Sequence, residues 1–221
     1  MTVAYQIKEA DAQLSRTIIE RRPLGSRDVR IDLKFCGICH SDLVAASDKL
    51  GGGIFPMVPG HEMVGSISEI GAEVEGFAVG DAVGVGCIAD SCRTCHSCNM
   101  GDEHYCEEGF TLSFNSRDRK GRVNYGGYSS DYVVDYDYLV PIPRGADLAK
   151  MAPLLCGGIT VYTPLKRFNV GPGTTLCVLG MGGLGHLAIQ FARAMGARVI
   201  VASRSESKRS DAKRLGAEEA L

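Results

Sequence analysis

Two patterns of hydrophobic and polar positions divide the chain near residue 150. Up to that point the apolar residues fall in short segments separated by glycine, proline and aspartate, and several segments alternate with a period of two. That period is typical of half-buried β-strands. Further along, short apolar runs alternate with segments that have helical spacing. We therefore expect two domains, residues 1–150 and residues 151–221.

The first domain is expected to be an irregular β-structure. Alternation is clearest over Val29–Phe35, where every second residue is apolar. Gly80-Asp81 is typical of a turn that leads into another such segment. The expected strands are Val29–Phe35, Met63–Ile70, Ala82–Val85, Tyr132–Val134 and Tyr138–Ile142.

The second domain is expected to begin a parallel sheet. Thr174–Leu179 is a largely apolar run, which is typical of a strand buried on both faces. Apolar residues then recur at helical spacing from Leu184 to Met195, and Gly196 stands where a C-terminal cap would. Strand, helix, strand and helix in this order start a doubly wound sheet. The remaining expected elements are a helix around Thr160–Phe168, a strand over Val199–Ala202 and a polar helix over Ser205–Leu215.

The composition of the 221 residues is that of a globular protein, with 45% hydrophobic residues, 23% charged residues and a net charge of −2. The near-neutral balance and the lack of a basic stripe argue against a nucleic-acid partner. No apolar run approaches the length of a membrane span, and Lys8, Glu9 and Asp11 argue against an N-terminal signal peptide. Nine cysteines then indicate metal and thiol chemistry in a reducing compartment, so we expect a cytoplasmic protein.

The strongest chemical signal is a C-x2-C-x2-C-x7-C pattern formed by Cys92, Cys95, Cys98 and Cys106. The intervening residues are small and polar, which predicts a loop held by a metal ion and neither a strand nor a helix. Disulfides between cysteines this close would be strained. An iron–sulfur cluster is the nearer alternative, but the ferredoxin pattern places its fourth cysteine three residues on, before a proline. We therefore predict a closed, structural Zn(Cys)4 site.

A G-x-G-x-x-G loop from Gly180 to Gly185 follows an expected strand and opens an expected helix. In that context it predicts dinucleotide binding, with the pyrophosphate at the helix N-terminus; a tight turn without a ligand is the alternative. The next strand ends at Ser203-Arg204-Ser205 without a carboxylate. Cations there can pair with a 2′-phosphate, which favours NADP(H) over NAD(H), unless they only form a solvated helix start. The candidate cofactor-binding residues are Gly180, Gly182, Gly183, Leu184, Gly185, Ser203, Arg204, Ser205, Lys208 and Thr160.

Other residues that could bind a metal lie far apart in the sequence. Their spacing alone does not indicate that they form one site. Cys39-His40-Ser41-Asp42 follows an expected strand, Gly60-His61-Glu62 precedes another, and Cys156 lies before the expected helix. Taken singly, each cysteine could be a buried thiol and His61 a core histidine.

Together these motifs resemble the zinc-dependent medium-chain alcohol dehydrogenases, most closely the cinnamyl-alcohol-dehydrogenase and aldehyde-reductase branch. The resemblance covers the whole chain and implies a GroES-like β domain followed by a Rossmann domain. The segments that carry it, in the family's order, are FCGICHSDL at Phe35–Leu43, PGHEMVG at Pro59–Gly65, the four cysteines, LCGGITVY at Leu155–Tyr162 and the glycine loop.

The resemblance also implies roles for single residues. Cys39, His61 and Cys156 would bind a catalytic zinc, with Glu62 as a carboxylate able to approach the metal. Asp42 would orient His61, and Ser41 would relay the alcohol proton. The expected activity is the interconversion of primary alcohols and aldehydes, with two zinc ions per chain and NADP(H) as cofactors. A small alcohol or aldehyde is the expected partner, and homo-oligomerisation is left open.

Two features depart from the family pattern. Val44 stands where many relatives carry a histidine that continues the proton relay. The chain also has only the first strands and helices of a Rossmann domain, so we expect a C-terminally truncated enzyme. The alternative is a folded zinc-binding fragment with little or no activity. An NAD-dependent polyol or formaldehyde dehydrogenase of the same superfamily is disfavoured by Ser203.

Overall fold

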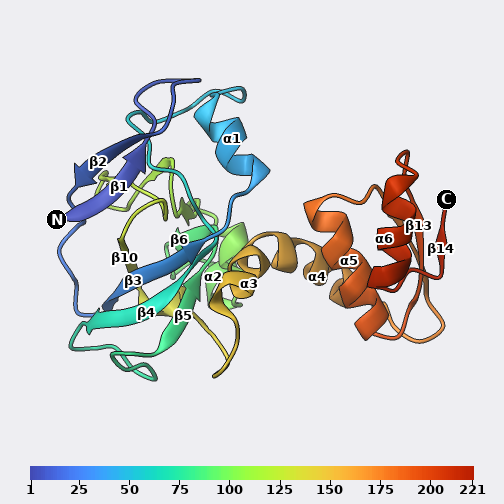
Figure 1. Ribbon diagram of the computed structural model, residues 1–221. Coiled ribbons are helices and arrows are strands. Elements are labelled where there is room, and N and C mark those ends of the chain that lie inside the picture. Colours follow the sequence, from blue (N-terminus) through green and yellow to red (C-terminus); the bar gives the residue numbers. More distant parts are fainter. The chain divides into compact units, whose positions relative to one another are not determined.

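The computed structural model describes all 221 residues, and the chain divides into two compact units, Met1–Cys156 and Gly157–Leu221 (Figure 1). The sequence suggested a division at residue 150. Residues 151–156 pack with the first unit because Ala152 and Leu155 are buried in one of its apolar clusters. None of the helices has both the length and the apolar character needed to cross a membrane.

The first unit is built from short strands, as its alternating pattern predicts. They are β1 (Thr2–Gln6), β2 (Ser15–Ile19), β3 (Asp28–Cys36), β4 (Met63–Ile70), β5 (Ala82–Val85), β6 (Ile88–Asp90), β7 (Thr111–Leu112), β8 (Ser116–Arg117), β9 (Val123–Asn124), β10 (Asp131–Asp135) and β11 (Val140–Pro141). Five of them form an antiparallel sheet in the order β10-β3-β4-β5-β11. The others pair as β1-β2, β6-β7 and β8-β9.

The five-stranded sheet carries the main core of this unit. Strands β4 and β5 have the predicted bounds, and β3 extends one residue beyond its prediction at each end. Val29 and Ile31 are buried, but Phe35 is 46% exposed although it continues the alternation. The reason is a shift in the pairing of β3 with β4 between Leu33 and Phe35, which re-aims the side chains that follow.

The expected strand Tyr138–Ile142 is wrong for most of its length. The structure has a 3-10 helix, η2 (Tyr136–Tyr138), followed by the two-residue edge strand β11. The carboxylate of Asp135 accepts a hydrogen bond from the Asp137 backbone N–H at 3.0 Å, which stabilises a turn where the apolar pattern suggests extension. Pro141 has no N–H to donate and is therefore tolerated at the edge of the sheet.

Short helices connect these strands: α1 (His40–Ala46), α2 (His96–Asn99), η1 (Glu103–Tyr105), α3 (Leu148–Met151) and η3 (Ala152–Leu155). The carboxylate of Asp42 caps α1 by accepting a hydrogen bond from the Cys39 backbone N–H at 2.9 Å. The segment with the four cysteines was expected to contain no helix, but α2 forms one helical turn within it. Cys95 is the N-cap of that turn.

The second unit is a parallel three-stranded sheet in the order β12-β13-β14, with three helices. The order of strands and helices confirms the prediction, except that the short β14 was not foreseen. Gly196 and Gly216 follow α5 and α6 with φ of 88° and 113°, the left-handed geometry that ends helices. The elements are α4 (Gly157–Arg167), β12 (Thr175–Leu179), α5 (Gly183–Ala194), β13 (Arg198–Ala202), α6 (Ser207–Leu215) and β14 (Glu219–Ala220).

Strand β12 is not buried on both faces, contrary to the prediction from its apolar run. Val178 is 8% exposed and belongs to the core cluster of this unit, whereas Leu179 is 82% exposed. The strand lies at the edge of the sheet, and α5 packs on only one side of it. One apolar face of β12 is therefore open.

Candidate metal centres and nucleotide-binding loop

The first candidate site is the segment from Ser91 to Glu108, which we call the metal lobe. The Sγ atoms of its four cysteines lie within 4.8 Å of one another, and those of Cys92 and Cys98 are 3.8 Å apart. A tetrahedral zinc ion with Zn–S distances of about 2.3 Å places its sulfur ligands about 3.8 Å apart. The sulfur positions therefore fit a zinc ion, and the four cysteines predicted to act together do converge.

Backbone N–H groups point at these sulfur atoms. The amide of Cys95 donates to Cys92 Sγ at 3.3 Å, that of Cys92 to Cys106 Sγ at 3.4 Å, and that of Glu107 to Cys95 Sγ at 3.5 Å. Hydrogen bonds from the backbone of Thr94 and Cys95 lower the pKa of the Cys92 thiol to about 6. These backbone hydrogen bonds thus favour the thiolate form of Cys92, the form that metal ligation requires, whereas the pKa of the Cys98 thiol is raised to about 11.

The second candidate site joins the scattered residues of the sequence. The ligand atoms of Cys39, His61, Glu62 and Cys156 lie within 4.8 Å of one another, and Cys39 Sγ is 4.0 Å from Cys156 Sγ. Cys39 precedes α1, the His61-Glu62 pair precedes β4, and Cys156 follows η3. Only the tertiary fold brings these three segments together. Two sulfurs and one imidazole are the ligand types of a catalytic zinc site with an open position.

Asp42 contacts two of the candidate ligand residues of this second site through hydrogen bonds. It is 3% exposed, and its Oδ1 lies 3.1 Å from His61 Nδ1. It also accepts hydrogen bonds from the Cys39 and Gly60 backbone amides, at 2.9 and 3.0 Å, and from the Tyr128 hydroxyl at 3.0 Å. Burial opposes ionisation, but the hydrogen bond with His61 and those from the backbone hold the pKa of Asp42 below its usual value. Since Nδ1 faces Asp42, Nε2 is the nitrogen left for a metal.

The imidazole of His61 is buried, and burial alone would lower its pKa. The hydrogen bonds with Asp42 and Cys156 outweigh burial and raise the pKa to about 11. Metal ligation needs the neutral ring, so a metal entering this site displaces a proton. The neighbouring Glu62 is 4% exposed, and burial raises its pKa above the usual range.

A cavity of about 530 Å³ opens beside His61, within the first unit. Ser41 and Val44, one turn apart on α1, both line it. The ring of Phe114 stacks on the His61 imidazole, with centroids 5.6 Å apart and an interplanar angle of 13°. Ala45, Leu50 and Leu112 add apolar surface, and the polar side chains of His40, Asp48 and Asn115 line the cavity as well. The cavity therefore offers both an apolar surface and polar groups to a substrate.

Three residues of this site were missed by sequence reasoning. Phe114 covers His61, Tyr128 donates to Asp42, and Cys87 lines the cavity. A hydrogen bond with the Cys156 thiol lowers the pKa of Cys87. No motif spacing marks these residues, because each reaches the site only through long-range packing.

The glycines of the loop between β12 and α5 serve three different purposes. Gly180 has φ of 85°, which only glycine adopts without strain. A Cβ on Gly185 would lie 2.2 Å from the Gly180 carbonyl oxygen, whereas a Cβ on Gly182 or Gly183 would meet nothing within 4 Å. The first glycine thus makes the turn and Gly185 lets α5 approach the strand. Gly182 and Gly183 leave open space at the helix N-terminus, which fits a pyrophosphate.

The residues expected to select the nucleotide follow β13. Ser203 accepts a hydrogen bond from the Ser205 amide at 3.3 Å, and the side chains of Arg204 and Lys208 are exposed. Ser205 in turn accepts the Lys208 amide at 3.1 Å through its carbonyl, which starts α6. Thr160 is exposed on α4. The structure brings the serines and the start of α6 together at the end of the strand.

A small antiparallel β domain with two zinc-type ligand clusters, followed by a glycine-loop unit with a parallel sheet, defines a zinc-binding dehydrogenase of the medium-chain type. Comparison with known proteins identifies the family. Residues 25–144 match the alcohol dehydrogenase GroES-like domain, and residues 183–221 match the zinc-binding dehydrogenase family. The chain therefore belongs to the zinc-dependent medium-chain alcohol dehydrogenases, in the branch that includes the cinnamyl alcohol dehydrogenases, and this confirms the resemblance and the fold class expected from the sequence.

Individual relatives agree with this assignment. The chain is 51% identical over 216 residues to a probable formaldehyde dehydrogenase of Bacillus subtilis, covering 98% of this chain and 62% of that protein. It is 48% identical to an NADP-dependent alcohol dehydrogenase C of Mycolicibacterium smegmatis, over 97% of this chain and 62% of that protein. The chain thus spans about 62% of the length of these curated relatives.

Solved structures show the same similarity. A cinnamyl alcohol dehydrogenase of Sorghum bicolor matches all of this chain and 64% of its own, with a TM-score of 0.96 and 43% identity. A cinnamyl alcohol dehydrogenase of Helicobacter pylori complexed with NADP(H) has a TM-score of 0.95 and 41% identity, over 99% of this chain and 63% of its own.

Proposed function

We propose that this chain is part of a zinc-dependent oxidoreductase, which interconverts primary alcohols and aldehydes with NADP(H). The observation that carries the proposal is the convergence of Cys39, His61 and Cys156 beside a largely apolar cavity. The names of the relatives support it, since they include NADP-dependent alcohol dehydrogenases and cinnamyl alcohol dehydrogenases. The chain spans about 62% of the length of these relatives. The activity is therefore proposed for a protein of their full length.

In this proposal the chain holds two zinc ions, a structural one in the metal lobe and a catalytic one on Cys39, His61 and Cys156. When bound, the catalytic zinc polarises the substrate oxygen and the nicotinamide exchanges hydride with the substrate carbon. The chain's own residues fix the ligands: Asp42 holds His61 in one tautomer and one orientation. Glu62 is the buried carboxylate able to approach the same position.

Proton transfer in this proposal begins at Ser41. Its hydroxyl lines the cavity together with His61, so Ser41 Oγ can exchange a proton with the substrate oxygen. The next cavity-lining residue along α1 is Val44, which can neither accept nor donate a proton. Val44 therefore does not continue the relay, and in this proposal the proton passes from Ser41 to solvent, to cofactor hydroxyls or to another titratable side chain of the cavity, His40 or Asp48. Ser41→Ala should lower turnover without changing the zinc content, whereas Ser47→Ala, at the C-terminal cap of the same helix, should leave both unchanged.

The choice of NADP(H) is proposed from the residues after β13. Gly180, Gly182, Gly183, Leu184 and Gly185 would hold the pyrophosphate at the start of α5. Ser203, Arg204, Ser205 and Lys208 would surround a 2′-phosphate, and we keep Thr160 as a further candidate. A hydrogen bond to a charged group contributes roughly 1.5–3 kcal/mol, so Arg204→Ala should weaken NADPH binding by about tenfold or more. Binding of NADH should change little.

The proposal is tested with zinc-loaded protein, by NADPH binding and by NADPH oxidation in the presence of cinnamaldehyde. We expect tighter binding of NADPH than of NADH, and turnover that depends on Cys39, so that Cys39→Ser abolishes it while the metal lobe keeps its zinc. Protein that binds neither zinc nor a nicotinamide nucleotide would contradict the proposal.

A specific observation favours a second candidate for the 221-residue chain by itself, a folded zinc-binding fragment with little activity. The open face of β12, with Leu179 82% exposed, leaves the nucleotide unit with an uncovered sheet. Two bound zinc ions and measurable NADPH binding without turnover would support this candidate. Robust aldehyde reduction by the monomeric chain would exclude it.

The remaining parts of the proposal concern the surroundings of the protein. Its substrate would be a small alcohol or aldehyde, and we propose no nucleic-acid partner. All nine cysteines are free thiols. Six of them belong to the two candidate metal clusters, and they can bind a metal only while they are reduced. A reducing compartment, the cytoplasm, suits this chemistry best.

A further inference from the structure

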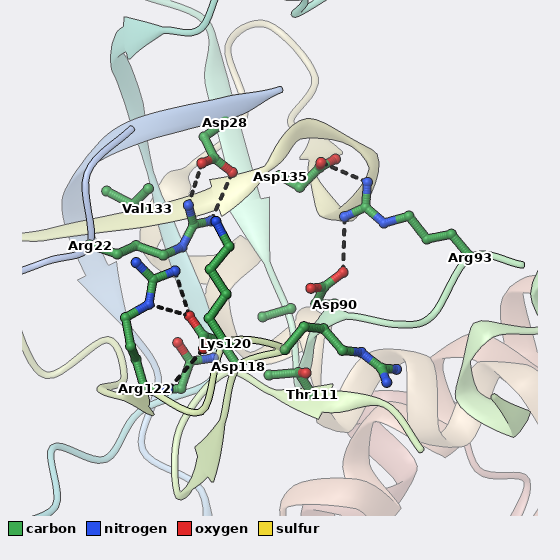
Figure 2. A pocket seen from close by; sticks show the side chains of 13 residues that line it. Arg22, Asp28, Asp90, Arg93, Thr111, Asp118, Lys120, Arg122, Val133 and Asp135 are labelled. Atoms are coloured by element: carbon green, nitrogen blue, oxygen red, sulfur yellow. Dashed lines mark hydrogen bonds and ion pairs between the residues drawn. The ribbon is translucent and has the colours of Figure 1, made fainter. Parts of the chain in front are cut away.

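A charged pocket of about 170 Å³ lies in the first unit, next to the metal lobe (Figure 2). Most of its arginines are neutralised by aspartates across the pocket. Figure 2 shows these pairs as dashed lines, and they are Arg22 with Asp28, Arg122 with Asp118, and Arg93 with both Asp90 and Asp135. Each of these guanidinium groups thus has at least one carboxylate partner within 3 Å.

Arg119, which also lines the pocket, is engaged differently. Its Nη2 lies 3.6 Å from Cys106 Sγ and donates to the Gly109 carbonyl oxygen as well. Its only carboxylate neighbour is Glu108, at 3.7 Å from Nη1, and the Glu108 side chain is 63% exposed. An exposed pair at that distance contributes little. Arg119 therefore has no close carboxylate partner, and its Nη2 is shared between the Gly109 carbonyl oxygen and the sulfur of a candidate metal ligand.

This position matters because of the charge of the metal lobe. Four thiolates around one Zn²⁺ ion carry a net charge of −2, and Cys98 and Cys106 are buried. The other donors to these sulfurs are neutral backbone amides, and the Cys98 thiol itself donates to the Ser91 hydroxyl oxygen at 3.3 Å. Arg119 is the one cationic side chain in hydrogen-bond contact with any of these sulfurs. A hydrogen bond from a charged donor is roughly twice as strong as a neutral one.

The backbone around Arg119 is fixed well enough to present this side chain. Arg119 lies in the turn that connects β8 to β9. The carboxylate of Asp118 accepts hydrogen bonds from the Lys120 and Arg122 amides, both at 2.9 Å, and the Gly121 amide donates to the Asp118 carbonyl at 2.8 Å. The turn belongs to the β-structure and not to the metal lobe, so Arg119 reaches the lobe from outside it.

We propose that Arg119 is a positioning residue of the structural metal centre. Its guanidinium balances the negative charge of the tetrathiolate site and holds the Cys106 sulfur in place from the β8–β9 turn, which slows the loss of the metal. The inference rests on the zinc assignment of the metal lobe, but it does not depend on the proposed dehydrogenase activity.

The experiment measures metal release in the full 221-residue chain carrying Cys39→Ser, so that the metal lobe is the main zinc site. Zinc release to a chromophoric chelator is compared for the parent, Arg119→Gln, Arg119→Lys and Arg117→Gln. Arg117 is the matched control, because it lies on the neighbouring strand β8 and its guanidinium donates to the Gly121 carbonyl at 2.9 Å. Circular dichroism checks that each variant is folded.

Outer partners of metal ligands typically change metal affinity by roughly 10–100-fold, so Arg119→Gln should release zinc about tenfold faster. Arg119→Lys, which keeps the charge, should be intermediate, and Arg117→Gln should behave like the parent. With Co²⁺ in place of Zn²⁺, Arg119→Gln should also shift the sulfur-to-cobalt absorption bands, a change that a purely structural tether to Gly109 would not cause.

Release from Arg119→Gln within twofold of the parent, or equal acceleration by Arg117→Gln, would overturn the inference. Unshifted cobalt bands in Arg119→Gln would overturn it as well. A parent protein that takes up no metal in the lobe would instead overturn the zinc assignment on which the inference rests, and the two failures are thereby distinguished.

Discussion

At the scale of single residues, Asp42 connects more of the candidate catalytic site than any metal ligand does. One carboxylate caps α1 through the Cys39 amide, orients His61 and receives the Gly60 amide and the Tyr128 hydroxyl. A buried carboxylate with this many donors is stable only as an anion. The geometry of two candidate metal ligands thus depends on the one charge that both contact.

We expect Asp42→Asn to weaken zinc binding at the Cys39 site by roughly 10–100-fold, because the amide cannot accept the same bonds and no longer fixes the His61 tautomer. Zinc content measured during dialysis against a weak chelator should fall toward one ion per chain. Asp81→Asn serves as the control, because it changes a carboxylate that accepts a backbone amide in a turn and belongs to neither metal-ligand cluster. Retention of both ions by Asp42→Asn would refute the positioning role.

A second prediction at this scale concerns the partly buried pair of Arg22 and Asp28. Arg22 Nη2 is 2.8 Å from Asp28 Oδ1, and the Gly25 amide donates to the same carboxylate at 2.6 Å. Burial alone would raise the pKa of Asp28, but the hydrogen bonds from Arg22 and Gly25 lower it below the usual value. The pair therefore stabilises the fold fully above the unfolded pKa of about 3.9. That stabilisation is lost as the pH falls through the lower folded pKa.

Asp28→Asn should lower the free energy of unfolding by roughly 1–3 kcal/mol at neutral pH. Urea unfolding of both proteins between pH 7 and pH 3 should show this difference shrinking toward the acid end, since the wild type loses the same interaction by protonation. Asp137→Asn, at a more exposed ion pair with Arg27, should have a smaller effect. A difference that stays constant with pH would show that the ionised pair is not the cause.

At the scale of elements, the glycine loop separates folding from ligand binding. A Cβ on Gly185 would collide with the Gly180 carbonyl oxygen, whereas a Cβ on Gly182 would point into open space. The backbone of Gly182 has φ of −107°, which any residue adopts. The two positions therefore belong to the same motif but serve different purposes.

We expect Gly185→Ala to destabilise the second unit by roughly 1–3 kcal/mol through overpacking. Gly182→Ala should leave the unfolding midpoint unchanged and weaken NADPH binding, because the methyl group occupies the space proposed for the pyrophosphate. Thermal unfolding and nucleotide titration of the two variants test both statements. Equal loss of stability in both variants would contradict the steric difference between the two positions. Unchanged NADPH binding by Gly182→Ala would mean that the open space at Gly182 has no role in binding.

The same scale shows what the sequence can predict. Strands β4 and β5 and helices α4, α5 and α6 were predictable because their signals are local: alternation, helical spacing and a glycine beyond the helix end. The four cysteines of the lobe were equally local. Strand β11 was overpredicted because the Asp135 side chain stabilises a turn at Tyr136–Tyr138 that the apolar pattern does not reveal.

Contacts between distant segments could not be predicted in this way. Phe114 on His61, Tyr128 on Asp42 and Arg119 on Cys106 each join residues whose types are common and whose spacing is uninformative. The scattered ligands Cys39, His61 and Cys156 were named only through the family resemblance. Burial of β12 was overestimated because its apolar run says nothing about whether a second layer covers it.

At the scale of the whole molecule, the two kinds of cofactor fall in different units. Every candidate metal ligand lies in Met1–Cys156, and the glycine loop with the residues after β13 lies in Gly157–Leu221. Each unit has its own buried core, around Ile31 in the first and Ile189 in the second. Metal and nucleotide should therefore stabilise different parts of the chain.

We expect removal of zinc by a chelator to increase amide hydrogen exchange in the metal lobe and around Cys39 and His61, while residues 157–221 exchange as before. The physical reason is that zinc binding to four thiolates contributes roughly 10–16 kcal/mol of apparent free energy, which is available only to the segments that ligate it. NADPH should have the converse effect and protect the loop from Gly180 to Gly185 and the start of α6. Hydrogen exchange followed by mass spectrometry of the zinc-loaded, zinc-free and nucleotide-bound protein resolves the two units by peptide. Cys98→Ser, which removes one lobe ligand, should reproduce the zinc-free pattern in the lobe alone. If chelation loosened both units to the same degree, their stabilities would be coupled and the metal would support the nucleotide unit as well.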